Sequence, residues 1–256
     1  MRLHTPRLLW ILLWPLLLSA GAVAADLDRP AVEAELAAAE AAGRGADFTG
    51  HSLAGLDLRG LDFSGADLSG ADLSDSDLRR AKLAGARLVG AKLARAQLNL
   101  AWIMAADFSQ ADLSGAVLET LVVSQGMEVR REEAVNLTGA KLSGARMTAR
   151  FHFADLRGAD LSDLKASADM RNQSMGLIRT EFTSADLTGA KLTGAGLGHV
   201  DFKFTKLKGA DFRGADLTHA DFSGADLTEA DFTGAINEGA VFDSAVMTGV
   251  KGLPTR

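Results

Sequence analysis

The chain contains no cysteine and no tyrosine, and proline occurs only four times in 256 residues. Without cysteine there is no disulfide, no thiol catalysis and no cysteine-ligated metal. Aromatic residues are scarce at 6%, yet apolar residues make up 47% of the chain, which excludes disorder caused by low hydrophobicity. A core of mostly small and aliphatic side chains, together with 27 glycines, favours a repeat protein over an ordinary globular fold.

The common catalytic and nucleotide-binding motifs are also missing. The sequence has no phosphate-binding glycine loop, no G-x-S-x-G, no H-E-x-x-H and no calcium-binding loop. Aspartate is abundant, but it recurs at a regular spacing, and exposed carboxylates lack the shifted pKa that acid–base catalysis needs. We therefore expect no catalytic residue, no cofactor and no enzymatic activity.

Residues 1–25, MRLHTPRLLWILLWPLLLSAGAVAA, have the layout of a secretory signal peptide. Two arginines precede an apolar run over 8–18, and an A-x-A site at 22–24 predicts cleavage after Ala24 or Ala25. The run is shorter than the roughly 20 residues of a spanning helix, so cleavage is favoured over an uncleaved membrane anchor, the open alternative. We expect a periplasmic or secreted protein, with no stable membrane insertion after cleavage.

The charge balance is acidic. Removal of the first 25 residues takes away Arg2 and Arg7, which leaves 25 basic against 33 acidic residues and a net charge of −8. Such a balance argues against an electrostatic footprint for nucleic acid or for anionic lipid. We expect no nucleic-acid partner.

A period of five organises most of the remaining sequence. A large apolar residue stands at every fifth position from Phe48 to Val123, and all sixteen places are filled. A second array runs from Leu177 to Met247, with Asn237 as its exception. This period matches neither the 3.6 of an α-helix nor the alternation of a flat strand. It suits a chain that turns a corner every five residues, so that four sides close a square coil and successive coils stack at about 4.8 Å.

The repeats GADLSGADLS and TGADLTEADFTGA resemble the pentapeptide-repeat family, whose consensus is A-(D/N)-L-x-x. The resemblance covers nearly all of residues 46–249. It implies an all-β solenoid, a right-handed quadrilateral β-helix. The repeats would form about nine coils, a rod of roughly 45 Å at the spacing of β-strands.

Residues twenty positions apart should be stacked neighbours in such a coil. Opposite charges occur at this spacing and should pair between coils, as in Asp67–Arg87, Asp72–Lys92 and Asp186–Lys206. Phenylalanines also recur at this spacing. We predict one internal column from Phe182, Phe202, Phe222 and Phe242, with Phe212 and Phe232 on the opposite face.

The ends and interruptions divide the chain further. Residues 26–45 predict an N-terminal cap with a helix at about 30–42, whose Val32, Leu36 and Ala39 would cover the open end of the coils. The β-helix at 46–249 has irregular segments near 119–135 and 148–176, which are either binding elements or neutral insertions. A tail at 250–256 protects the other end less, so we expect that a homodimer could form through the C-terminal end.

His199 and His219 form the best local candidate for a metal site. They are twenty residues apart, and Asp201 and Asp221 follow them by two positions. Both histidines occupy an outward, variable place and both aspartates belong to the repeat, so we expect no metal site. Trp102 occupies an outward place normally held by aspartate. It is either a contact residue or lies under the 119–135 segment, and the second interpretation is favoured.

These observations favour an exported, non-catalytic scaffold or protein-binding module of the cell envelope with an unknown protein partner. The alternative comes from the family resemblance alone. Some cytosolic pentapeptide-repeat proteins resemble B-form DNA in width and charge and bind DNA gyrase. The export signal and the alternating aspartate and lysine columns of this chain depart from that pattern.

Overall fold

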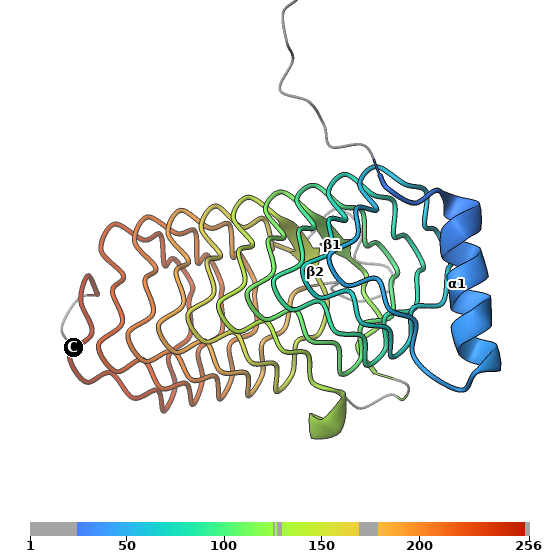
Figure 1. The fold of residues 1–256 in the computed structure, drawn as a ribbon. Helices are drawn as coiled ribbons and strands as arrows, with labels where there is room; N and C mark the ends of the chain where they lie inside the picture. The colour runs from blue at the N-terminus through green and yellow to red at the C-terminus, as the bar shows by residue number, and fades with distance from the viewer. Residues whose placement is uncertain (1–24, 125, 127–129, 169–178, 254–256) are drawn as a thin grey trace, which may run out of the picture.

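The structure is a computed structural model that describes residues 25–124, 126, 130–168 and 179–253. The predicted signal peptide therefore lies outside the described residues except for Ala25. Most of the described chain forms a rod of stacked coils (Figure 1). Helix α1, Arg29–Ala41, lies across one end of the rod, and the last coils form the other end. Among the residues described, no helix is long and apolar enough to cross a membrane.

Each five-residue unit makes one side of a coil and one corner. In the unit that begins at Ala225, the side chains of Ala225 and Leu227 are buried and Asp226 lies between them on the outside. The N–H of Asp226 donates to Thr205 O of the preceding coil, and the N–H of Leu227 donates to Val246 O of the following coil. Thus two neighbouring amides connect one side of a coil to both adjacent coils.

The aspartate of the repeat also shapes the corner. Asp226 Oδ1 accepts hydrogen bonds from the N–H of Thr228, at 3.0 Å, and from its hydroxyl, at 2.6 Å. Glu229 follows with a φ of 62°, in the left-handed region that glycine occupies in many other repeats. The consensus therefore reflects backbone geometry, because a short carboxylate closes the turn and a left-handed residue completes it.

Parallel bridges give the register between coils. Partners are twenty residues apart in regular parts of the rod, as in Asp67↔Arg87 and Arg87↔Asp107. Four bridge columns per coil give a four-sided cross-section. The sides are so short that only two strands are longer than a single bridge, β1 at Val117–Glu119 and β2 at Arg146–Thr148 in the described part, and they pair in parallel.

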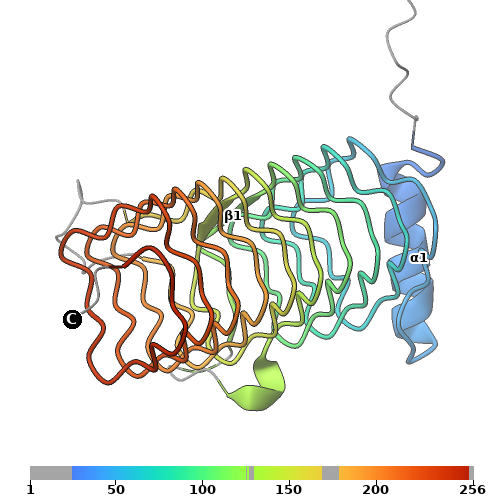
Figure 2. The same ribbon diagram turned by 90° about the vertical axis from the view of Figure 1, so that its left-hand side faces the viewer.

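The register changes at the two irregular segments. Asp107 pairs with Asn136, an offset of 29 residues, and Asp155 pairs with Asp186, an offset of 31. Compared with the regular spacing of twenty, these offsets add nine and eleven residues. The first insertion contains the short 3-10 helix η1, Arg131–Glu133, which projects from the side of the rod (Figure 2). Because residues 169–178 lie outside the description, the number of coils stays a prediction.

The core contains the predicted column of phenylalanines. Phe202 stacks on Phe182 with ring centroids 5.4 Å apart and on Phe222 at 4.9 Å. Phe212 meets Phe202 and Phe222 edge to face from the opposite side of the coil, at 5.9 and 5.6 Å. Phe242 continues the column, stacked on Phe222 at 5.1 Å, but is only partly buried in the last coil. The prediction of two facing columns is confirmed.

Candidate functional site

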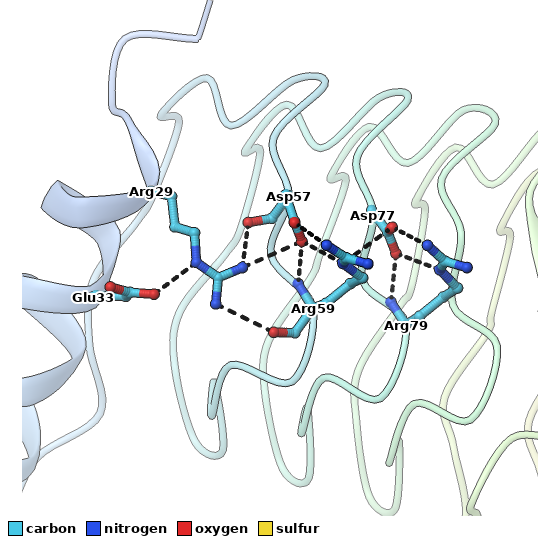
Figure 3. Close-up of polar contacts among 6 residues, drawn as sticks. All are labelled: Arg29, Glu33, Asp57, Arg59, Asp77 and Arg79. Carbon is cyan, nitrogen blue, oxygen red and sulfur yellow. Dashed lines mark hydrogen bonds and ion pairs between the residues drawn. The ribbon is translucent and has the colours of Figure 1, made fainter.

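Two regions of the surface depart from the uniform repeat, and the first lies beside α1. Arg29, near the start of the helix, reaches across to the coils (Figure 3). Its Nη1 donates to the backbone carbonyl of Asp57 at 2.8 Å, its Nη2 to that of Arg59 at 3.4 Å, and its Nε to Glu33 at 2.6 Å. The helix is therefore connected to two residues on one side of the rod. Val32 and Ala39 of α1 are buried against the same end of the coils.

A ladder of arginine–aspartate pairs continues from this contact along the rod. Arg59 holds Asp57 through its Nε and Nη2 atoms, and Arg79 holds Asp77 in the same manner one coil further on. Arg59 Nε also lies 3.6 Å from Asp77 Oδ2, which joins the two pairs (Figure 3). Each arginine lies two residues after its aspartate, so the turn itself places the guanidinium beside the carboxylate.

These pairs fix the charge state of the ladder. The hydrogen bond from the Arg59 side chain is the main cause that holds the pKa of Asp57 well below its usual range. Arg79 lowers the pKa of Asp77 through the same kind of bond. In return, the bond to Asp57 raises the pKa of Arg59. All four groups are therefore charged near neutral pH.

The second region is the side of the rod that carries Trp102, which we call the Trp102 face. The insertions of the chain border it on both edges. The first leaves the repeat after Val122, which bridges to Trp102, and the second enters before Glu181, which bridges to Arg150. The bridge columns of the two neighbouring faces continue across both insertions without a break, so these residues stay on one face. Its outward positions, in order along the rod, are Asp62, Lys82, Trp102, Val122, Arg150, Glu181, Asp201, Asp221 and Val241.

Charged groups on this face form a connected network. His152 Nε2 lies 2.9 Å from Glu181 Oε2, and Arg150 lies 3.8 Å from the same carboxylate. The hydrogen bond with His152 is the main cause that lowers the pKa of Glu181. Arg179 lies 3.7 Å from Glu181 and 3.0 Å from the buried carboxylate of Asp201. The network bridges three coils, and apart from Asp201 its residues do not belong to the repeat consensus.

A tryptophan and a phenylalanine side chain are exposed on or beside this face. Trp102 is 41% exposed, and Phe204, at the corner that follows Asp201, is 64% exposed. The expectation that residues 119–135 cover Trp102 is therefore wrong. The register gives the physical reason. Val122 occupies the outward position next to Trp102 on the following coil, and the chain leaves the repeat only after Val122. Trp102 remains available as a contact residue.

His199 and His219 do lie on adjacent coils. Their rings stack with centroids 4.9 Å apart. The carboxylates expected beside them are used elsewhere, since Asp201 pairs with Arg179 at 3.0 Å and Asp221 with Lys203 at 3.0 Å. No group of three or more histidine, aspartate or glutamate side chains is placed to hold a metal ion in the described ranges.

The predicted pairs between coils are present. Arg87 lies 3.8 Å from Asp67, Lys92 lies 3.9 Å from Asp72, and Lys206 lies 3.2 Å from Asp186. Sequence reasoning missed the ladder beside α1, although a signal existed. The motif D-L-R occurs at 57–59 and again at 77–79, twenty residues apart.

Comparison with known proteins supports the family. The model of pentapeptide repeats, with eight copies, matches residues 44–80, 76–119, 133–163 and 197–234, which is more than half of the chain. No curated protein sequence matches the chain significantly.

Solved structures of pentapeptide repeat proteins are similar to this chain. HetL, involved in heterocyst differentiation regulation in the cyanobacterium Nostoc sp. strain PCC 7120, is 26% identical, with 88% of this chain and 96% of that chain covered and a TM-score of 0.41. QnrB1, a plasmid-mediated fluoroquinolone resistance protein, is 22% identical in a trypsin-treated form, with 77% and 85% covered and a TM-score of 0.49. A protein from the thylakoid lumen of Arabidopsis thaliana is 35% identical, with 44% and 67% covered and a TM-score of 0.19.

Pentapeptide repeat proteins form right-handed quadrilateral β-helices and are generally non-catalytic scaffolds. The five-residue period, the twenty-residue bridges and the family match agree with one another. The chain belongs to the pentapeptide-repeat family.

Proposed function

We propose that this chain is an exported, non-catalytic scaffold of the cell envelope that binds a protein partner through the Trp102 face. The observation that carries the proposal is the pair of exposed aromatic side chains, Trp102 and Phe204, on a face bordered by both insertions. Insertions in a repeat scaffold commonly carry binding, and tryptophan and other aromatic residues are enriched at protein interfaces.

The size of this face suits a protein partner. Four coil steps separate Trp102 from Phe204 along the bridge columns, which corresponds to about 19 Å at the spacing of β-strands. An interface of standard size buries about 800 Å² on each partner. The charged network of Glu181 and Asp201 lies three and four coil steps from Trp102, beside Phe204, and its connected ion pairs would set the orientation of a partner.

The alternative is a DNA-mimicking protein that binds DNA gyrase. Such mimicry needs a surface that repeats negative charge as phosphates do. On this rod Arg87 and Lys206 pair with carboxylates of adjacent coils and interrupt the aspartate columns. We expect that the chain without residues 1–25 leaves gyrase supercoiling unchanged at micromolar concentration, and inhibition at that concentration would favour the alternative.

Site-specific photo-crosslinking in the native cells tests the proposed face. A photoreactive phenylalanine analogue replaces Trp102 or Phe204 in two separate variants. The matched control places it at Lys191, an exposed bridge residue of another face. We expect the same crosslinked partner band from the first two variants and no such band from the control. Equal labelling at all three positions, or none at Trp102 and Phe204 in correctly folded protein, would contradict the proposal.

A homodimer through the C-terminal end is the second part of the partner proposal. Ile236 is 58% exposed and Val246 is 49% exposed in the last coil. Sedimentation of the protein without residues 1–25 tests it, with Ile236→Asp as the variant that should be monomeric. A monomer at all concentrations for the parent protein would reject the dimer.

A further inference from the structure

The arginine ladder beside α1 borders an open recess. The recess has a volume of about 940 Å³ and lies over three successive coils. Its lining includes Arg29, Arg59, Arg79 and Arg80, together with the amide side chains of Gln97 and Asn99. Asp57 is the single carboxylate in the lining. Glu33, Asp57 and Asp77 pair with Arg29, Arg59 and Arg79, so the unpaired positive charge at the recess is that of Arg80.

Two of these arginines are held ready for a further ligand. The hydrogen bonds that Arg59 and Arg79 make to their aspartates use Nε and Nη2. The Nη1 amino group of each is on the opposite edge of the guanidinium, and no hydrogen bond involves it in the part of the chain that the structure describes. Because the aspartates fix both guanidinium planes, little side-chain entropy remains to be lost on binding an anion.

Arg80 has no carboxylate partner. Among the arginines of the described ranges, only Arg80 and Arg131 lie beyond ion-pair distance of every described carboxylate, and Arg131 instead lies 4.5 Å over the ring of Phe153. Arg80 follows Arg79 directly and lines the same recess. Its five N–H donors are therefore available at the edge of a site that already holds two fixed arginines.

We propose that this recess binds the phosphate group of a small soluble ligand, with Arg59, Arg79 and Arg80 as its donors. Three guanidinium groups from two adjacent coils suit a tetrahedral oxyanion, because each can give charge-assisted hydrogen bonds to a different oxygen. The acidic remainder of the rod repels extended polyanions, which disfavours nucleic acid and an anionic membrane surface. The volume of the recess leaves space for the rest of a small molecule beside Gln97 and Asn99.

The chain supplies a matched control for the arginine pairs. Arg213 holds Asp211 through Nε, at 2.8 Å, and Nη2, at 2.6 Å, as Arg79 holds Asp77. Arg213 lies in another bridge column, far along the rod, and does not line the recess. Arg213 thus has one aspartate–arginine pair, whereas the proposed site has two stacked pairs and Arg80.

Isothermal titration calorimetry with sodium tripolyphosphate, at fixed ionic strength, tests the proposal on the chain without residues 1–25. We expect saturable binding of one ion per chain, weakened by about tenfold or more in both Arg80→Gln and Arg79→Gln. Arg213→Gln should bind as the parent protein does. Circular dichroism checks the fold, and Arg80→Gln is the decisive variant because Arg80 has no ion pair to lose.

Two outcomes would overturn the site. The first is the absence of saturable binding up to about 10 mM, which corresponds to less than about 3 kcal/mol of affinity. The second is an equal loss in Arg213→Gln and Arg80→Gln, which would mean nonspecific attraction to surface arginines. Vesicles of phosphatidylglycerol form a separate arm. Binding to vesicles without binding of tripolyphosphate would reject a small soluble ligand.

Discussion

Arg29 Nη1 donates a hydrogen bond of 2.8 Å to the backbone carbonyl of Asp57, and this contact connects the N-terminal helix to the coils. The same guanidinium also donates to the backbone carbonyl of Arg59, in the same coil as Asp57, and to Glu33 within the helix. A solenoid exposes apolar side chains and unpaired backbone groups at its ends, so a covering element stabilises the terminal coil. The ladder that begins at Arg29 is thus part of the attachment of α1.

Replacement of Arg29 by alanine should loosen this attachment. We expect a loss of about 1 kcal/mol in the free energy of unfolding, because a partly exposed charged hydrogen-bond network is lost. Hydrogen exchange should become faster in α1 and in residues 46–66. The control is Arg44→Ala, because Arg44 pairs with Glu35 of the helix and donates to the neighbouring Gly45 carbonyl, not to the coil residues that Arg29 contacts. Faster exchange in both variants alike, or in neither, would contradict this role of Arg29.

Phe202 and Phe204 offer a matched pair for the core. Phe202 is fully buried between Phe182 and Phe222, whereas Phe204 is 64% exposed. We expect Phe202→Ala to lower the free energy of unfolding by about 3–5 kcal/mol, because it leaves a cavity in the aromatic column. Phe204→Ala should change it by less than about 0.5 kcal/mol. Urea denaturation of the two variants measures both values, and comparable losses would show that the assigned register is wrong.

The sequence predicts much of this fold because the five-residue period determines on which side of which coil each residue lies. A spacing of twenty residues places Phe182 beneath Phe202 and Asp67 beside Arg87 without any knowledge of the coordinates. The contact of Arg29 with Asp57 could not be obtained in this way, because it depends on how a helix outside the repeat packs on the first coils. The position of Trp102 relative to the first insertion does not follow from the period either, because the sequence does not show at which residue the chain leaves the repeat.

The Trp102 face illustrates the same limit. Its consensus positions follow from counting, but the offsets of 29 and 31 residues at the insertions come only from the bridges. The pairing of His152 with Glu181 depends on that changed register, since these residues are 29 apart in sequence. Sequence counting with a fixed period of twenty therefore cannot bring them together.

Acid should destabilise the rod. Hydrogen bonds from the side chain and N–H of Thr228 lower the pKa of Asp226, and those of Ser162 lower the pKa of Asp160. Because these pKa values are lower in the folded than in the unfolded chain, the folded state binds fewer protons. The stabilisation is therefore present above the unfolded value of about 4 and is lost as the pH falls below it. Urea denaturation between neutral and acid pH measures this, and an unfolding free energy that stays constant or rises on acidification would contradict it.

Zinc should not stabilise the rod through its stacked histidines. The carboxylates near His199 and His219 are paired with Arg179 and Lys203, so the imidazoles lack the further ligands that zinc needs. We expect an unchanged melting temperature at about tenfold excess of zinc, because a ligand stabilises only the state that it binds. A rise that disappears in His199→Ala would contradict this prediction.

The central claim is that the chain acts as an exported rod with a partner in the cell envelope. Fractionation of the native cells, followed by the intact mass of the isolated protein, tests this most directly. We predict a species in the periplasmic or secreted fraction that begins at Ala25 or Asp26. A full-length species in the cytosol would contradict export and would place gyrase among the accessible partners.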